Sequence, residues 1–182
     1  MLNIYRLDRD DNLIKGIGLP AFIHNGSYHQ ITIKVYEDGV IDCWDLVTIE
    51  EFKEKVLEGW VVTQVPKGEE ITCHHLFYGT SQLECYVEID DFVKEVEDTL
   101  NELQGKKTST EKCVQAFSQF LNEPNEINRE ELKLAYLSVP SHCRCYLLGD
   151  MDLKDGPIRM CIENDKLQPK TIADYKEWYL SR

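Results

Sequence analysis

The sequence lacks a hydrophobic run long enough to cross a membrane. A membrane helix needs roughly 18 uncharged apolar residues in succession, and no stretch of this chain is apolar over that length. The N-terminal segment MLNIYRLDRDDN is charged from Arg6 onward, and it has neither the apolar core nor the small-residue cleavage site of a signal peptide. We therefore expect a cytoplasmic protein that has lost no targeting segment and has no membrane partner.

Motifs for phosphate and nucleic-acid binding are also missing. Gly16 and Gly18 do not begin a G-x-G-x-x-G loop, because residue 21 is alanine and no long helical pattern follows at once. The sequence has no aromatic stacking surface with interleaved basic residues, which binding of single-stranded nucleic acid requires. We predict no cofactor and no nucleic-acid partner.

The seven cysteines do not form the pattern of a disulfide scaffold. Their number is odd, they are spread through hydrophobic runs, and no pair has the C-x-x-C spacing. Small secreted disulfide proteins are shorter and have a higher density of cysteine. We expect reduced thiols that are mostly buried.

Basic residues are scarce in the first part of the chain. The formal net charge is -13, with 33 acidic and 20 basic residues. Residues 1–105 carry 21 acidic and 8 basic residues, and residues 106–182 carry 12 of each, so the whole excess lies in the first part. The negative electrostatic potential of this part repels nucleic-acid phosphates and speeds association with a basic protein. A general contribution to solubility is the alternative.

Alternating apolar residues predict an antiparallel sheet over residues 20–88. Ile31, Ile33 and Val35 share one face of a strand at 28–36. An Asn-Gly pair before this strand and an Asp-Gly pair after it are signals for hairpin turns. A short strand at 2–7 precedes the sheet.

Two helices are expected to pack on one face of this sheet. Thr48 and Glu51 fit the capping box of a helix that begins there. A second helix runs from Asp90 to Leu103, and Gly105 then breaks the pattern where the charge balance also changes. We therefore predict an acidic α+β domain at 1–105.

The remainder, residues 106–182, is predicted to be a charge-neutral and mostly helical module. Cys143–Leu148 and Ile158–Glu163 alternate in the manner of strands, so this module is expected to contain a two-stranded β element. The predicted fold class is α+β, with an antiparallel meander sheet, two helices on one of its faces and this C-terminal module. The sequence leaves open whether the two parts pack as one globule.

Cysteine and histidine occur together in two places. Cys73, His74 and His75 are adjacent, and His142 precedes Cys143 and Cys145, which one residue separates. Side chains two positions apart on a strand share a face, so the weak candidates for a zinc site are Cys73, His75, Cys143 and Cys145. Cys73 beside His74 and His75 is the candidate for an enzyme with a cysteine nucleophile next to a histidine, and the wider enzyme hypothesis adds Cys143 and Cys145. Thiols packed in a sheet are the alternative, and we predict no metal and no catalytic residue.

Aromatic residues accompany acidic ones in the first part of the chain. Trp44 precedes Asp45 on a predicted strand, and Trp60 follows the helix that begins at Thr48. Aromatic and acidic groups together suit the capture of a basic protein surface. The candidate binding residues are Trp44, Asp45, Trp60, His74 and His75. The alternative is that both tryptophans fill the core beneath the helix.

Two stretches of sequence carry a resemblance to a family: FIHNGSY from Phe22, DGVIDCW to Trp44, GWVVTQVP from Gly59 and His74-His75, then Val139-Pro140, LGDMD from Leu148 and KDGPI from Lys154. They resemble an uncharacterised bacterial family of small acidic cytoplasmic proteins, a domain of unknown function. The resemblance implies a bacterial origin and two modules, and it brings no catalytic residues. By class analogy, the hypothesis is a non-enzymatic protein-binding module with a basic partner, immunity-like in its sharpest form.

Overall fold

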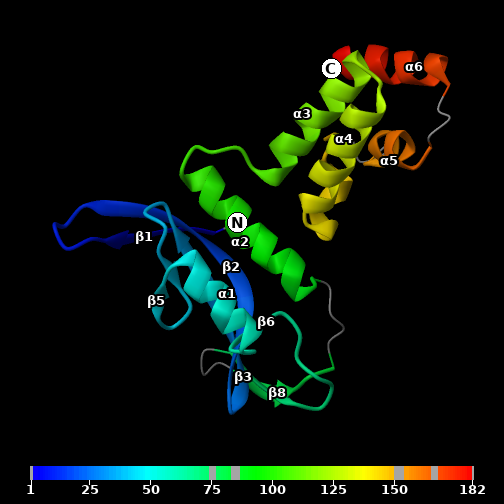
Figure 1. Ribbon diagram of the computed structural model, residues 1–182. Coiled ribbons are helices and arrows are strands. Elements are labelled where there is room, and N and C mark those ends of the chain that lie inside the picture. The colour runs from blue at the N-terminus through cyan, green and yellow to red at the C-terminus, as the bar shows by residue number, and fades with distance from the viewer. Residues whose placement is uncertain (1, 74–76, 83–86, 150–153, 165–167, 182) are drawn as a thin grey trace. The chain divides into compact units, whose positions relative to one another are not determined.

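The computed structural model describes residues 2–73, 77–82, 87–149, 154–164 and 168–181. Its contacts divide the chain into two compact units, Met1–Lys106 and Lys107–Arg182. Among the described residues, the first unit contains a sheet with helices and the second contains helices (Figure 1), so the predicted α+β class is confirmed. None of these helices has the length and apolarity needed to cross a membrane.

The first unit is built on one long hairpin. Strands β2 (Leu13–Asn25) and β3 (Ser27–Tyr36) pair antiparallel. Gly26 turns between them at a φ of 75°, where glycine has no Cβ to clash. Shorter strands extend the hairpin on both sides: β1 (Leu2–Leu7) and β6 (Val61–Val62) beside β2, β4 (Ile41–Asp42) and β7 (Glu70–Cys73) beside β3, β5 (Leu46–Val47) beside β4, and β8 (Phe77–Thr80) beside β7.

Strand β7 departs from the expected meander because it runs parallel to β3. A parallel pair needs a crossover connection. The chain supplies one through β4, β5, helix α1 (Ile49–Leu57) and β6 before it returns to β3. As a consequence, Thr72 lies opposite His29 at the end of the hairpin.

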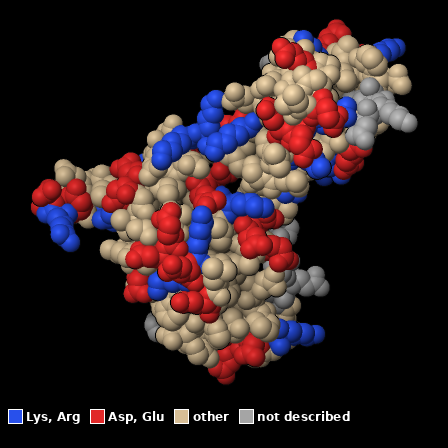
Figure 2. All heavy atoms as spheres, in the orientation of Figure 1, with Lys and Arg blue, Asp and Glu red and all other residues tan. Residues whose placement is uncertain are grey.

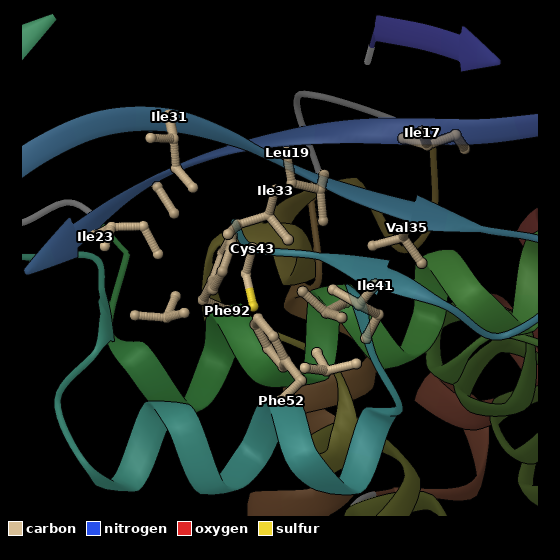
Figure 3. Close-up of a cluster of buried hydrophobic side chains, with 14 residues drawn as sticks. Ile17, Leu19, Ile23, Ile31, Ile33, Val35, Ile41, Cys43, Phe52 and Phe92 are labelled. Carbon is tan, nitrogen blue, oxygen red and sulfur yellow. The ribbon is translucent and has the colours of Figure 1, made fainter. Parts of the chain in front are cut away.

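Helices α1 and α2 (Ile89–Leu103) cover one face of the sheet, as predicted (Figure 1). Figure 3 shows the apolar side chains of β2 and β3 directed toward Phe52 and Phe92, whose ring centroids are 6.5 Å apart. The capping box predicted at Thr48 and Glu51 is confirmed, with both reciprocal hydrogen bonds present. After the helix, Gly59 turns at a φ of 73°, and the next residue returns to the sheet.

All the secondary-structure elements in the described residues of the second unit are helices. It comprises α3 (Ser109–Asn122), α4 (Glu126–Ser138), the 3-10 helix η1 (Ser141–Tyr146), α5 (Gly156–Glu163) and α6 (Pro169–Leu180). The predicted two-stranded β element is therefore wrong. Its first strand, Cys143–Leu148, coincides with η1 and the turn that follows, and its second, Ile158–Glu163, lies in α5.

Local contacts explain why these two segments form helices instead of strands. Pro157 lies in the first turn of α5, where its missing N–H has no helical partner to lose. Ile158 and Cys161 are three residues apart and both fully buried, which is helical spacing. Arg144 donates from Nε to the carbonyl of Val139 at 3.1 Å and so holds η1 against the end of α4.

Candidate functional site

Trp44 occupies the middle of a short loop that joins β4 to β5. Its φ is 77°, in the left-handed region that residues other than glycine rarely adopt. Two hydrogen bonds hold this loop. The Trp44 N–H donates to Asp42 Oδ1 at 3.2 Å, and the Cys43 N–H donates to the Asp45 carbonyl at 3.0 Å. The loop buries Cys43 completely and leaves Trp44 50% exposed.

Two further rings lie against the exposed indole of Trp44. The His29 ring centroid is 5.2 Å away, and the Trp60 ring is 6.0 Å away in an edge-to-face arrangement. Trp60 Nε1 donates to the carbonyl of Cys43 at 3.4 Å, and its ring packs against the hydrophobic core. These separations are typical of favourable aromatic pairs. We define the Trp44 cluster as His29, Trp44, Asp45, Lys55 and Trp60.

The cluster already holds one cation of its own chain. Lys55 of α1 places Nζ 5.2 Å from the centroid of the Trp60 ring and 2.8 Å from Asp45 Oδ2. The hydrogen bond with Asp45 raises the pKa of Lys55 above its usual value. A cation within about 6 Å of an indole centroid is attracted by the ring. Asp45, Lys55 and Trp60 therefore form a carboxylate, ammonium and indole arrangement at the surface.

His29 continues the row of core side chains on β3 to the end of the hairpin. It pairs with Ile23 of β2, and side chains on alternate positions of a strand share a face. Hydroxyl groups lie on both sides of its ring, with Nδ1 2.6 Å from Thr72 Oγ1 and Nε2 3.1 Å from Ser27 Oγ. These two contacts fix the plane of the imidazole beneath Trp44.

Ser27, His29 and Thr72 are arranged like the nucleophile, the base and the orienting group of a catalytic triad. A base in this arrangement takes the proton of the serine hydroxyl. In hydrolytic triads the orienting group is a buried carboxylate, which stabilises the imidazolium that forms. Thr72 is neutral and provides no such charge. The arrangement therefore positions the ring well and supports general-base chemistry poorly.

The carboxylates nearest Trp44 are matched by lysines. Asp42 Oδ2 lies 2.8 Å from Lys34 Nζ, and this hydrogen bond raises the pKa of Lys34. Asp45 is paired with Lys55. Figure 2 shows acidic and basic side chains side by side over the region of α1 and α2. The excess of acid is thus a property of the wider surface of the first unit, whereas the charges of the Trp44 cluster are nearly balanced.

The structure brings together three of the five candidate binding residues. Trp44, Asp45 and Trp60 belong to the Trp44 cluster, and Trp60 is also partly a core residue. His74 and His75 lie outside the described residues, so the structure does not place them. Their role in binding stays a prediction.

The candidate zinc ligands are spread over both units. Cys73 lies half-buried in β7, and Cys143 and Cys145 lie half-buried in η1. In the part of the chain that the structure describes, no three histidine, cysteine or acidic side chains gather as metal ligands would. His75 is not among those residues, so its pairing with Cys73 is untested.

The buried thiols are poor candidates for a nucleophile. Cys43, Cys113 and Cys161 are buried, and the six described cysteines are free. Burial raises the pKa of Cys113 and of Cys161 to about 12, and it also raises the pKa of Cys43. Because the thiolate is the reactive form, burial favours the unreactive protonated form of these three thiols.

Sequence reasoning missed His29, Lys55 and Thr72. A signal for His29 was present, since it lies two positions before Ile31 and so shares the inward face of the strand. No comparable signal marked Lys55 among the charged residues of α1. Thr72 joins the site through the parallel pairing of β7 with β3, which local sequence does not reveal.

The fold and the site define a two-unit α+β protein with an aromatic cluster on the surface of its first unit. Residues 4–107 match a family model described as Domain of unknown function (DUF7638), which covers more than half of the chain, and the chain belongs to that family. Residues 108–177 match a second model, Domain of unknown function (DUF7639). Neither the curated proteins nor the solved structures gave a match. The resemblance to an uncharacterised family is confirmed, and a bacterial origin stays a prediction.

Proposed function

We propose that this protein is a non-enzymatic binding module that engages a basic protein through the Trp44 cluster. The observation that carries the proposal is Trp44 itself, whose large apolar ring is half exposed on a strained backbone. Left-handed backbone costs a side-chain-bearing residue about 1–2 kcal/mol. Strain of this kind gathers at functional sites, where the surrounding structure over-determines it.

Interface energetics favour a role for this indole in recognition. Tryptophan is enriched among the few residues that dominate binding energy, and such anchors lie in packed surroundings that exclude water. Trp44 has such surroundings on one side, because His29 and Trp60 lie against its ring. Its other side remains open to a partner.

The charge of the first part of the chain favours a basic partner. The formal net charge is -13, and the acidic excess lies within residues 1–105, which include the cluster. Complementary charge speeds encounter and excludes acidic competitors. An immunity-like role in a bacterial cytoplasm, in which this surface blocks a basic toxin, is the sharpest form of the proposal.

Calorimetric titration of the full chain with a panel of basic proteins tests the proposal. We expect binding that weakens as salt increases, and a Trp44→Ala variant that binds about 30-fold more weakly, as a dominant interface residue would. Tyr5→Ala is the matched control, because Tyr5 is an aromatic residue that is 56% exposed on β1 of the same unit. Equal losses in the two variants, or binding that does not respond to salt, would overturn the proposal.

A further inference from the structure

The arrangement of Lys55 shows which chemical group the Trp44 cluster accepts. Its ammonium lies over the Trp60 indole and against the Asp45 carboxylate, which are the two features that bind a cationic side chain. We propose that the cluster binds an arginine side chain of the partner, and that this arginine displaces Lys55. This inference rests on the proposed function and names the group that is recognised.

The carboxylate that binds Lys55 is accessible from solvent. The Asp45 side chain is 63% exposed, whereas that of Lys55 is 21% exposed. An ion pair with one partner this exposed contributes little to stability, because water and salt screen it. An incoming cation can therefore take the Asp45 carboxylate without disrupting the fold of the first unit.

Released from Asp45, Lys55 has another carboxylate within reach. Glu58 lies three residues further along the chain, and its charge already acts on the Lys55 ammonium. Residues three apart at the end of a helix are neighbours on its surface. The exchange thus moves Lys55 from one carboxylate to another and leaves no buried charge unpaired.

Guanidinium fits the vacated position better than a second ammonium. It is planar, stacks on indole faces and donates to a carboxylate through two parallel N–H groups, whereas an ammonium acts as a compact point charge. It is also more weakly hydrated. The half-exposed Trp44 indole, whose centroid lies 6.0 Å from that of Trp60 in an edge-to-face arrangement, adds apolar surface beside the ring on which the guanidinium stacks. Arginine therefore has an advantage over the resident lysine that a partner lysine lacks.

Asp42 does not take part in the exchange. It is bound to Lys34 and accepts the hydrogen bond from the Trp44 backbone, so it holds the loop while Asp45 changes partners. The site that receives the arginine is therefore formed by Asp45 and the two tryptophans, on a loop that stays in place.

Calorimetry with hexaarginine and hexalysine peptides tests the inference on the full chain. Wild-type protein is expected to bind hexaarginine at least about fivefold more tightly than hexalysine. Lys55→Met removes the resident cation and keeps an unbranched chain over Trp60, so we expect about fivefold tighter binding of hexaarginine. Lys53→Met is the matched control, because Lys53 also lies in α1 and pairs with Glu97. Removal of its charge should change the affinity less than twofold, on the order of a screened surface interaction.

Several outcomes would overturn the inference. If Lys55→Met and Lys53→Met change the affinity for hexaarginine equally, Lys55 does not occupy the binding position. Weaker binding by Lys55→Met, repeated by Lys55→Gln in protein shown to be folded by circular dichroism, would show that Lys55 supports binding and is not displaced by the arginine. If these results occur while Trp44→Ala still loses binding to a basic protein, the proposed function stands and only the arginine exchange fails. If neither peptide and none of the basic proteins binds, both the arginine exchange and the proposed function are wrong.

Discussion

At the scale of single residues, Trp44 combines two unfavourable features. Its Cβ is held in left-handed backbone, where it crowds the neighbouring carbonyl. Its indole also leaves apolar surface in water. The Asp42 carboxylate partly compensates by accepting the hydrogen bond from the Trp44 N–H. A partner that covers the indole would offset the second cost, which is why we place recognition at this residue.

Replacement of Trp44 by glycine and by alanine measures the backbone strain. Both variants lose the indole, but only glycine relieves the left-handed backbone, so Trp44→Gly should be about 1 kcal/mol more stable than Trp44→Ala. Urea unfolding measures the difference. At Leu46, in the adjacent strand β5, the order should be reversed, because glycine weakens an ordinary strand. Equal stability of the two Trp44 variants would show that the left-handed backbone carries no cost.

Two buried thiols and one partly buried phenol of the second unit predict that its stability falls at alkaline pH. Burial raises the pKa of Cys113 and Cys161 from 9.0 to about 12. For Tyr136, burial and then the hydrogen bond to Asp155 raise the pKa from 10.0 to about 12. The folded state therefore holds these groups neutral while the unfolded chain ionises, so the stabilisation is complete below the unfolded pKa and is lost as the pH rises toward the folded pKa.

Urea unfolding of a Trp44→Phe, Trp60→Phe variant, followed by the fluorescence of the remaining Trp178, checks this sign for the second unit. We expect the free energy of unfolding to fall as the pH increases from about 9 toward about 12. A Cys113→Ala, Cys161→Ala variant should show a shallower dependence, because two of the three groups are gone. A free energy of unfolding that stays constant over this range would contradict the burial of these groups.

At the scale of elements, the sequence predicted those features that local chemistry determines. The capping box at Thr48, the hairpin turn at Gly26 and the inward row of β3 all depend on residues close together in the chain. The parallel pairing of β7 with β3 was missed because the two strands are distant in sequence. The helical conformation of Ile158–Glu163 was missed because a short apolar run fits a strand and a helix equally well.

The residues of the candidate site also fall into two groups: those that local sequence indicated and those that only the tertiary structure brings in. Residue type alone singled out Trp44, Asp45 and Trp60. The alternation of β3 contained the information for His29, as the inward position of Ile31 shows. Lys55 and Thr72 reach the site only through the packing of α1 and the pairing of β7, which no local pattern reports.

The pairing of β2 with β3 depends on a glycine, Gly16, that leaves room for side chain and backbone atoms of β3. A Cβ on Gly16 would lie 2.7 Å from Tyr36 Cδ1 and 2.7 Å from the Val35 carbonyl oxygen. The carbonyl belongs to the backbone and cannot move away cheaply. Gly16→Ala should therefore destabilise the first unit by about 1–3 kcal/mol, as overpacking does.

Gly79→Ala is the control for this substitution. Gly79 lies in β8, and a Cβ there would meet no atom within 4 Å. We expect a change within about 0.5 kcal/mol, measured by urea unfolding under the same conditions as Gly16→Ala. A tolerated Gly16→Ala would mean that Tyr36 is not packed against β2 as described.

At the scale of the whole molecule, structure and family comparisons divide the chain at the same place. The compact units meet at Lys106 and Lys107, and the two family models meet at residues 107 and 108. The acidic excess ends there too, since residues 106–182 carry 12 acidic and 12 basic residues. We propose that the two units are separate domains and that the first one binds the basic partner.

Each unit carries tryptophan, so one spectrum can report on both. Trp44 and Trp60 belong to the Trp44 cluster, and Trp178 packs against the core of the second unit. The most direct measurement is a ¹H–¹⁵N correlation spectrum of the three indole N–H groups, assigned with single Trp→Phe variants, during titration with an arginine-rich basic protein. We predict that the signals of Trp44 and Trp60 shift and saturate while that of Trp178 does not move. A shift confined to Trp178, or three signals that stay in place, would contradict recognition through the Trp44 cluster.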